Sequence, residues 1–425
     1  MFTFLVILQA AFGAILLCFV AYLLLLLAAA LMGKKRFVQP PSNDSCTFTV
    51  VIPAHNEEMV ITETLQSLRA QDYPAERFQV VVVADNCTDS TSDLAHAAGA
   101  RVLERTNTSE RGKGYALAWA IRELGAELNP KDAYVIVDAD TWVAPDFLRL
   151  MAARVASQSD SRGFCALQGR YGVLNAAEGW RAALMSGAFD LFNHVKPMGR
   201  ETLKLGVGLK GNGMVFTRSL MEALPWLGDS ITEDIDYGLE LARKHGVRVA
   251  YVPEAVVLAQ MPTTADQARS QRERWELGRY ELLKTKAFPL LGEAVKKRRA
   301  PLWDAGFDLI VPPLGELFAM VVVWAVGIEV LFRAGVLLSP RPWSWLCAGT
   351  FVALLVYVIA GFAVAGAKPE AYFALLRAPF YVVWKLCLYA GKLFTRRSGG
   401  PSEWVRTERA PISGPPTKPA KPTDN

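Results

Sequence analysis

Three short apolar runs decide the fold: Thr47 to Ile52 reads TFTVVI, Phe78 to Ala84 reads FQVVVVA, and Ala133 to Val137 reads AYVIV. All three are rich in β-branched residues, and segments with the periodicity of amphipathic helices separate them. Strands that are apolar throughout and alternate with helices are typical of a parallel sheet covered on both faces. The sequence therefore predicts an α/β domain with a mostly parallel sheet.

Acidic residues follow each of these runs. They are Glu57 and Glu58 after the first run, Asp85 and Asp89 after the second, and Asp138 and Asp140 after the third. Ligand sites in such sheets form beyond the carboxyl ends of the strands, so we expect these acids at one edge. A single acid after a strand usually caps the next helix, which is our interpretation of Asp89.

Asp138 and Asp140 are the pair that a cap does not explain. Alternation sends residues two apart to the same side, and two carboxylates held together repel unless a cation or a proton offsets them. Oxygen ligands of this kind suit Mg²⁺ or Mn²⁺ with a shell completed by a phosphate-bearing substrate. The sequence has no G-x-x-x-x-G-K-[ST] loop and no G-x-G-x-x-G after the first strand, which disfavours P-loop NTPases and dinucleotide enzymes.

The first 33 residues contain no charged side chain and exceed the ~20 residues that cross a bilayer. Lys34, Lys35 and Arg36 follow this run, whereas a cleaved signal peptide carries its basic residues in front. We therefore interpret the run Phe2 to Met32 as a membrane span. The positive-inside rule then places Met1 outside and the following domain in the cytoplasm.

Two further spans are predicted, at about Pro313 to Phe332 and about Trp345 to Ala367. Ala371 to Phe394 mixes cations with aromatic residues, which favours an interfacial helix over a fourth span. The predicted organisation is a transmembrane helix and basic anchor over residues 1–36, a cytoplasmic catalytic domain over 45–290, interfacial helices and two transmembrane helices over 291–394, and a basic, proline-rich cytoplasmic tail over 395–425.

Composition excludes several classes of protein. The chain has 425 residues, 52% of them apolar, and a net charge of +5, which is too dilute for a dedicated nucleic-acid-binding protein. The six cysteines are scattered without C-x-x-C spacing, which argues against a disulfide framework or a structural zinc site. We expect no nucleic acid among the partners.

Seven motifs occur in a fixed order along the chain. They are VIPAHNEE (51–58), VVVADNCTD (81–89), RGKGYALAWA (111–120), VDAD (137–140), GNGMVF (211–216), TEDIDYGLEL (232–241) and QRERW (271–275). This series resembles the membrane-bound family 2 glycosyltransferases with the GT-A fold, which include the synthases of cellulose, hyaluronan and poly-N-acetylglucosamine. The last motif matches the Q-x-x-R-W of that family.

The resemblance implies a donor site for a UDP-sugar. In it Asp85 hydrogen-bonds the uracil, Glu57 lies nearby on the nucleoside, and Lys113 belongs to the same site. Asp140 would hold the Mg²⁺ or Mn²⁺ ion that bridges the diphosphate. Asp138 would contact the nucleotide or the outer shell of the metal.

The resemblance also makes Asp234 the general base, which takes the proton of the acceptor hydroxyl. One base and one displacement invert the anomeric centre, so an α-linked UDP-hexose gives a β-linked product. Without the other motifs, the acids at 233, 234 and 236 would be read as a helix cap and a favourable first turn. Spacing alone does not choose among these three acids.

The Q-x-x-R-W motif supplies an acceptor and diphosphate site. Helical spacing places Gln271, Arg274 and Trp275 on one face. Arg274 would neutralise the departing diphosphate, and Trp275 offers a flat surface for a sugar ring. In Gly211 to Gly213, the glycines allow either a close backbone approach or a tight turn.

These features predict an inverting β-glycosyltransferase anchored in a bacterial inner membrane, with a UDP-sugar donor and a polysaccharide or lipid-linked glycan as acceptor. Membrane lipids are expected contacts, and secretion or assembly partners fit a polysaccharide synthase. Single addition to a lipid acceptor, as in ceramide glucosyltransferases, is the alternative, because the chain has few spans. An inactive scaffold or translocation subunit is a further alternative, against which the complete set of acids argues.

Overall fold

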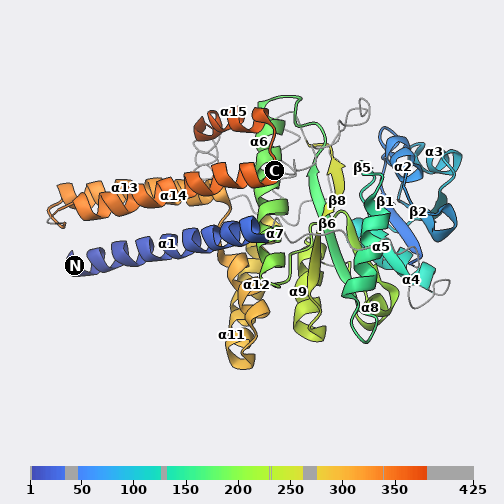
Figure 1. Cartoon of the computed structure of the whole chain (residues 1–425), viewed down its shortest axis with the longest axis horizontal. Coiled ribbons are helices and arrows are strands. Elements are labelled where there is room, and N and C mark those ends of the chain that lie inside the picture. The colour runs from blue at the N-terminus through green and yellow to red at the C-terminus, as the bar shows by residue number, and fades with distance from the viewer. Residues whose placement is uncertain are drawn as a thin grey trace.

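The structure is a computed structural model that describes residues 2–33, 46–125, 132–228, 230, 232–261, 275–337 and 339–380. These residues form a sheet with helices on both faces and a group of long helices that projects to one side (Figure 1). Gln271, Arg274, most of the predicted interfacial helix and the tail 395–425 lie outside the described residues.

The described residues contain one sheet of eight strands in the order β3-β2-β1-β4-β7-β6-β8-β5. The strands are β1 (Phe48–Ala54), β2 (Phe78–Asp85), β3 (Arg101–Arg105), β4 (Ala133–Ile136), β5 (Thr141–Val143), β6 (Ala166–Val173), β7 (Met214–Thr217) and β8 (Val249–Ala259). Parallel pairs join β1 to β2 and β4, β2 to β3, and β6 to β8. Antiparallel pairs join β7 to β4 and β6, and β5 to β8. The predicted α/β fold with a mostly parallel sheet is confirmed.

The three apolar runs of the sequence correspond to β1, β2 and β4. In β1, Phe48, Val50 and Ile52 belong to the hydrophobic core on one face of the sheet, whereas Val51 belongs to the core on the other face. A strand that is buried on both faces needs no polar side, which explains its continuous apolar sequence.

Helices cover both faces of the sheet. The core with Phe48 includes residues of α2 (Ile61–Arg69), α3 (Thr91–Ala97) and α5 (Phe147–Gln158). The core with Val51 includes residues of α4 (Lys113–Gly125), α8 (Arg218–Ala223) and α9 (Glu233–Glu240), and it continues into the long helices. One continuous core therefore connects the sheet to the projecting helices.

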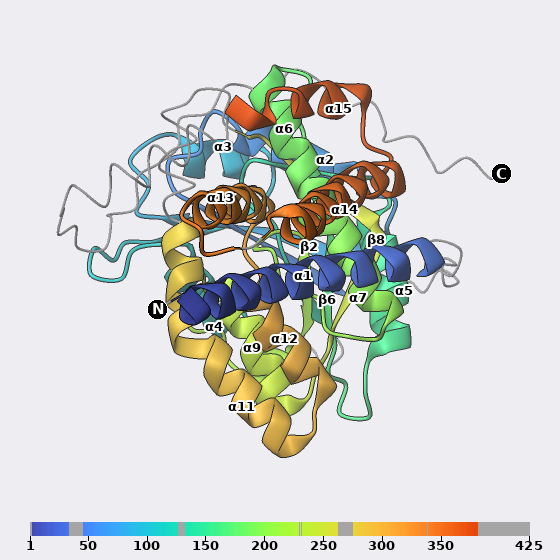
Figure 2. The same ribbon diagram turned by 90° about the vertical axis from the view of Figure 1, so that its left-hand side faces the viewer.

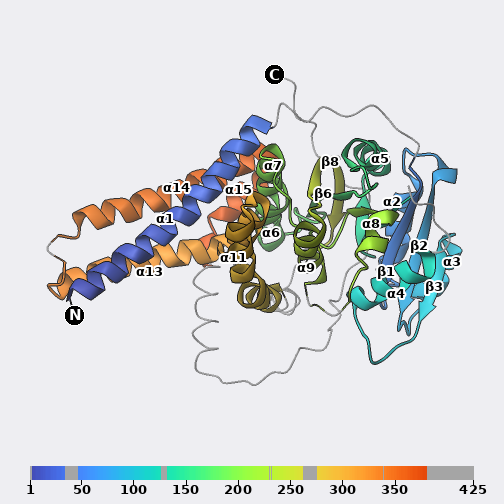
Figure 3. The same cartoon turned by 90° about the horizontal axis from the view of Figure 1, so that it is seen from below.

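Short helices lie between the sheet and the long helices (Figure 3). They are α6 (Trp180–Phe189), η2 (Asp190–Val195) and α7 (Lys196–Thr202). Of these, η2 contacts β6 on one side and the long helices on the other, and α7 contacts β8 and the first long helix. The other helices are η1 (Ala75–Arg77), η3 (Leu241–His245), a helix over 275–282, η4 (Leu283–Ala287), α11 (Phe288–Lys297), α12 (Ala300–Ile310) and α15 (Pro369–Leu375).

Three helices are long and apolar enough to cross a membrane, by length and composition, among the residues described. They are α1 (Phe2–Gly33), α13 (Leu314–Arg333) and α14 (Arg341–Ala365), and they extend side by side from the domain (Figures 1 and 2). Their positions agree with the three predicted spans to within a few residues. Of the predicted interfacial helix, the structure describes only the part up to residue 380, which includes α15.

A buried ionic cluster joins α1 to the rest of the protein. Arg200 of α7 lies 2.8 Å from Asp304 Oδ2 and 3.2 Å from Asp308 Oδ2, both on α12. Lys196 Nζ lies 2.5 Å from Asp308 Oδ1, and the hydroxyl of Tyr22 on α1 donates to Asp304 Oδ1 over 2.9 Å. These five side chains, the Tyr22–Arg200 cluster, link α1 to α7 and α12.

Candidate active site

The acids that follow β1, β2 and β4 lie at one edge of the sheet, because these strands are parallel neighbours. Glu57, Asp85 and Asp140 are buried, and Asp138 is partly exposed. The backbone N–H of Glu57 donates to Thr91 Oγ1 over 2.8 Å, which ties the end of β1 to the first residue of α3. The structure therefore brings together the predicted donor-site acids.

Asp85 forms a buried ion pair with Arg105, a residue that the sequence analysis missed. Arg105 Nη1 lies 2.7 Å from Asp85 Oδ1, and both side chains are less than a tenth exposed. The two residues are opposite each other in the parallel pair of β2 and β3. A strand prediction for Arg101 to Arg105 would have placed Arg105 at this edge. The pair fixes the carboxylate that was predicted to contact uracil.

Lys113, the first residue of α4, connects Asp138 to the glycine motif. Its Nζ lies 2.5 Å from Asp138 Oδ1 and donates to the carbonyl oxygen of Gly211 over 2.6 Å. Burial alone would lower the pKa of Lys113, but the carboxylates of Asp138, Glu233 and Asp234 outweigh burial and raise it. Lys113 is therefore charged at neutral pH, and it is the cation that offsets Asp138 in this structure.

Asp138 and Asp140 follow β4, which ends at Ile136, so strand alternation does not place their side chains. Asn212 holds this segment instead. Its Oδ1 accepts the backbone N–H of Asp138 over 3.2 Å, and its Nδ2 donates to Thr141 Oγ1 over 2.8 Å. Asn212 is fully buried, so the glycine motif supports the segment that carries both acids.

Asp140 is the predicted metal ligand. No group of three or more His, Cys, Asp or Glu side chains that could hold a metal ion is found within the described ranges. The carboxylate of Asp140, with Asp138 two residues away, fits Mg²⁺ or Mn²⁺ where phosphate and water oxygens supply the remaining ligands. The residues present thus suit a cation that arrives with a diphosphate.

Asp234 lies in the first turn of α9 and approaches the same glycine motif. A Cβ atom placed on Gly211 would lie 3.4 Å from Asp234 Oδ2 and 3.6 Å from Lys113 Nζ, and Gly211 has a φ of +77°. Any other residue there would meet backbone strain next to both charged groups. Burial raises the pKa of Asp234, and the nearby ammonium groups of Lys113 and Lys210 offset only part of this effect.

The neighbouring acids of α9 are placed differently. Asp236 Oδ1 lies 3.0 Å from Lys286 Nζ, an ion pair that holds this carboxylate against η4. Glu233 contributes to the raised pKa of Lys113. Of the three acids in the motif, Asp234 is the one that adjoins Gly211.

Trp275 begins the helix over 275–282, with 36% of its surface exposed. Its ring centroid lies 6.3 Å from that of Phe189, the last residue of α6. The same helix packs closely on the start of α9, since a Cβ placed on Gly278 would lie 2.3 Å from Thr232 Cγ2. The helix that Trp275 begins therefore packs on the start of the helix that carries Asp234, whereas the predicted companions Gln271 and Arg274 lie outside the described residues.

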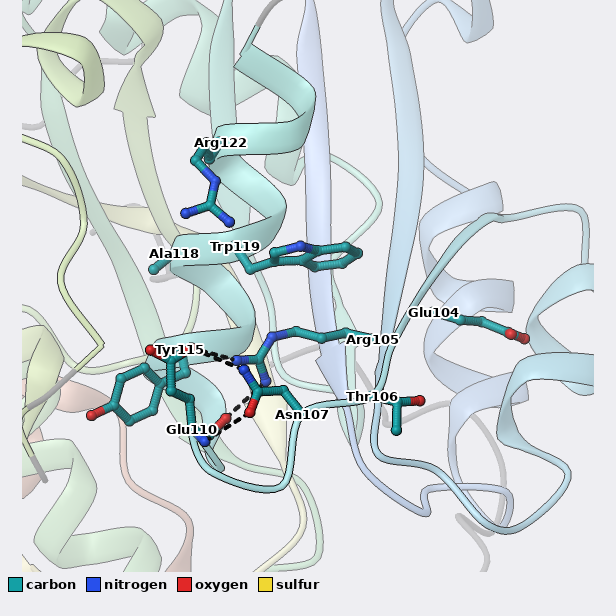
Figure 4. A pocket seen from close by; sticks show the side chains of 9 residues that line it. All are labelled: Glu104, Arg105, Thr106, Asn107, Glu110, Tyr115, Ala118, Trp119 and Arg122. Carbon is teal, nitrogen blue, oxygen red and sulfur yellow. Dashed lines mark hydrogen bonds and ion pairs between the residues drawn. The ribbon is translucent and has the colours of Figure 1, made fainter.

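A pocket of about 400 Å³ lies between β3 and α4 (Figure 4). Its lining residues are Glu104, Arg105, Thr106, Asn107, Glu110, Tyr115, Ala118, Trp119 and Arg122. Arg105 donates within it to the backbone oxygen of Glu110 over 2.8 Å. None of the predicted site residues is among these lining residues, although Arg105 connects the pocket to Asp85.

The sequence profile of a family described as "Glycosyltransferase like family 2" matches residues 45–278, more than half of the chain. The chain belongs to this glycosyltransferase family. The match covers the sheet and the site at its edge, and with it the expected resemblance and the GT-A type of α/β fold are confirmed.

Several proteins are similar to this family 2 glycosyltransferase. A probable glycosyltransferase, YdaM of Bacillus subtilis, is 27% identical over 56% of this chain and 56% of its own. A β-monoglucosyldiacylglycerol synthase of Synechocystis is 29% identical over 55% of this chain and 47% of its own. The chain thus spans about half the length of these curated relatives. Among solved structures, the mannosyltransferase PcManGT of Pyrobaculum calidifontis is 19% identical, with a TM-score of 0.47 over 86% of this chain and 98% of its own.

Proposed function

We propose that this protein is a membrane-anchored, inverting β-glycosyltransferase that moves a hexose or N-acetylhexosamine from a UDP-sugar to a growing polysaccharide or lipid-linked glycan. The observation that carries the proposal is the convergence of Lys113, Asp138 and Asp234 on the loop at Gly211. A charged lysine can stabilise the negative charge of a nucleoside diphosphate, and a buried acid with a raised pKa can accept the proton of an incoming hydroxyl.

The donor side of the site comprises the strand ends. Asp85, oriented by Arg105, would hydrogen-bond the uracil, with Glu57 beside the nucleoside. Lys113 and Arg274 would compensate the charge of the diphosphate. Asp140 would hold a Mg²⁺ or Mn²⁺ ion with Asp138 nearby, and such an ion stabilises the charge that grows on a leaving nucleotide.

The acceptor side comprises Asp234 and Trp275. The ionised carboxylate of Asp234 would take the proton of the acceptor hydroxyl while that oxygen attacks the anomeric carbon from the face opposite UDP. The bond from the anomeric carbon to the UDP oxygen breaks, and the anomeric configuration inverts. Trp275, exposed beside Phe189, would support the acceptor sugar, with Gln271 in the same segment.

The proposed location is a bacterial inner membrane, with the catalytic domain in the cytoplasm. Three candidate spans on one side of the domain support anchoring. Lys34 to Arg36 directly follow the first of them, which supports the cytoplasmic orientation by the positive-inside rule.

Single addition to a lipid acceptor is the second candidate function. It is supported by the similarity to a protein named as a β-monoglucosyldiacylglycerol synthase. Product size separates the two candidates, because processive transfer gives a ladder of products and single transfer gives one.

The decisive experiment is a screen for UDP release. We expect the purified full chain in lipid nanodiscs, with Mg²⁺ or Mn²⁺, to release UDP from one class of UDP-sugar when membrane acceptors are present. Mass spectrometry of the product then identifies the sugar and the acceptor. Absence of UDP release with all UDP-hexoses and UDP-N-acetylhexosamines would contradict the proposal.

Replacement of Asp140 tests the metal role. We expect Asp140→Ala to bind UDP with an affinity that no longer depends on Mg²⁺ or Mn²⁺, because the carboxylate that holds the cation is gone. Calorimetric titration of UDP with and without the metal measures this, and Asp93→Asn, at an exposed acid of α3, is the control. An unchanged metal dependence in Asp140→Ala would remove Asp140 from the metal site.

A further inference from the structure

Lys210 is a half-buried lysine close to Asp234. The proposed function gives Lys210 no role. Its Nζ lies 3.6 Å from the centroid of the Phe192 ring. The structure shows no hydrogen bond or ion pair of this ammonium group with any residue that it describes. Lys210 directly precedes Gly211, the residue that Asp234 approaches.

The charged neighbours of Lys210 already have partners. Lys196, whose Nζ lies 5.0 Å from the same Phe192 ring, pairs with Asp308, and Arg200 pairs with Asp304 and Asp308. Burial, together with the charges of Lys196 and Arg200, lowers the pKa of Lys210 to about 7, and the carboxylates of Asp308 and Asp234 offset only part of this effect. Of the two lysines at the Phe192 ring, Lys210 is thus the closer one and has no ion pair with a carboxylate among the described residues, whereas Lys196 is paired with Asp308.

The position of this group faces the membrane side of the domain. Phe192 is on η2, which packs against α14 and α1, and 49% of its surface is exposed. Figure 3 shows α6 and α7, the helices on either side of η2 in the chain, between the candidate spans and the sheet. Lys210 thus connects η2, which packs on two candidate spans, to Gly211, which adjoins Asp234.

We infer that Lys210 and Phe192, with Lys196 beside them, form a site for the phosphate head group of a membrane-borne acceptor. The exposed aromatic ring would contact the apolar part next to the head group, and Lys210 would donate to the phosphate oxygens. This inference rests on the proposed function, since it names the chemical class of the acceptor for the same site.

Photocrosslinking tests the inference without turnover. The full chain is placed in nanodiscs of a phosphate-free glycolipid, digalactosyldiacylglycerol, that contain a diazirine analogue of phosphatidic acid or of diacylglycerol with the same acyl chains. We expect the phosphatidic acid analogue to label the wild type about tenfold more strongly than the diacylglycerol analogue does. This is the effect of one hydrogen bond to a charged group. Lys210→Gln should lose this difference, and Lys210→Arg should keep most of it.

Two controls make the result specific. Lys204→Gln, at an exposed lysine of the same loop, should label like the wild type. Lys210→Gln should still bind UDP in calorimetry, which also shows that it folds. Should Lys210→Gln fail to fold, Phe192→Ser at the exposed ring is the second variant, and we expect it to reduce labelling by the phosphate analogue.

Four outcomes would overturn the inference. The two analogues could label the wild type equally, or Lys210→Gln could be labelled as fully as the wild type. Lys210→Gln could lose UDP binding while it keeps lipid labelling, or inorganic phosphate could compete for the site as well as phosphatidic acid does. The last would assign the site to free phosphate. If the wild type released no UDP but its labelling still depended on Lys210, the lipid site would stand and the proposed function alone would fail.

Discussion

Asp234→Asn should lower the turnover number for UDP release by roughly 10²–10⁴-fold, the typical contribution of a general base. The amide has nearly the same shape as the carboxylate but accepts no proton from the acceptor hydroxyl. The amide carries no charge, so the free-energy cost of burying a carboxylate is removed. The fold should therefore be retained. Calorimetry should show that UDP binds with an affinity close to that of the wild type.

Asp236→Asn is the matched control, because Asp236 lies in the same helical turn but pairs with Lys286 on η4. This variant should keep most of the turnover. If Asp236→Asn lost as much activity as Asp234→Asn, or if Asp234→Asn kept more than a tenth of the wild-type turnover, the assignment of the base would be wrong.

The pH profile gives a second test of Asp234. Burial raises the pKa of this carboxyl above its ordinary value, and only the ionised form takes a proton from the acceptor. Turnover should therefore be lost as pH falls through the raised pKa, at a higher pH than an exposed aspartate would give. In Asp234→Asn this acid limb should be absent from the residual activity.

Strands β1, β2 and β4 were predictable from sequence, whereas strands β5 to β8 were not. In β1, β2 and β4, burial on both faces leaves a continuous apolar run that a short window detects. By contrast, β8 contains Pro253 and Glu254 in its middle, next to the point where its register with β6 shifts between Gly169 and Arg170. Its pairing depends on a strand about 80 residues earlier, which no local signal specifies.

The same limit applies to the candidate site. The order of the motifs predicted the acids and Lys113 as site residues, but it did not reveal which side chains pair with which. Arg105 meets Asp85 only because β3 pairs with β2, and Lys210 approaches Phe192 only through the packing of η2. Pairwise partners of this kind come from tertiary structure, so the sequence predicted the acids and Lys113, and the structure added Arg105 and Lys210.

The Tyr22–Arg200 cluster is where we expect the largest effect on stability. Arg200 is 5% exposed and faces two carboxylates of α12. Burial alone would raise the pKa of Asp308, but Arg200, Lys196 and Lys210 outweigh it and hold that pKa well below the usual range. The pKa of Asp304, in contrast, is raised by burial in spite of Arg200. Both acids therefore depend on the guanidinium group to remain charged in a buried place.

Arg200→Met should lower the free energy of unfolding by about 3 kcal/mol or more, the cost of leaving buried charges without their partner. Thermal and denaturant unfolding in mixed micelles measure the loss. Arg333→Met is the control, because it removes an exposed pair with Glu329 at the end of α13 and should cost less than about 1 kcal/mol. A loss in Arg200→Met no larger than in Arg333→Met would show that the cluster contributes little to stability.

The loss should also depend on pH, with a sign that follows from Asp304. Without Arg200 the pKa of Asp304 rises further, so the folded variant binds a proton that the unfolded chain has released. Stability then falls as pH rises from the ordinary aspartate range towards the raised pKa of Asp304. We therefore expect Arg200→Met to be closer to the wild type at pH 5 than at pH 8, and Asp304→Asn in the same chain to remove most of that difference. A pH-independent loss would mean that packing of the arginine stem, rather than its charge, holds α1 and α12 to α7.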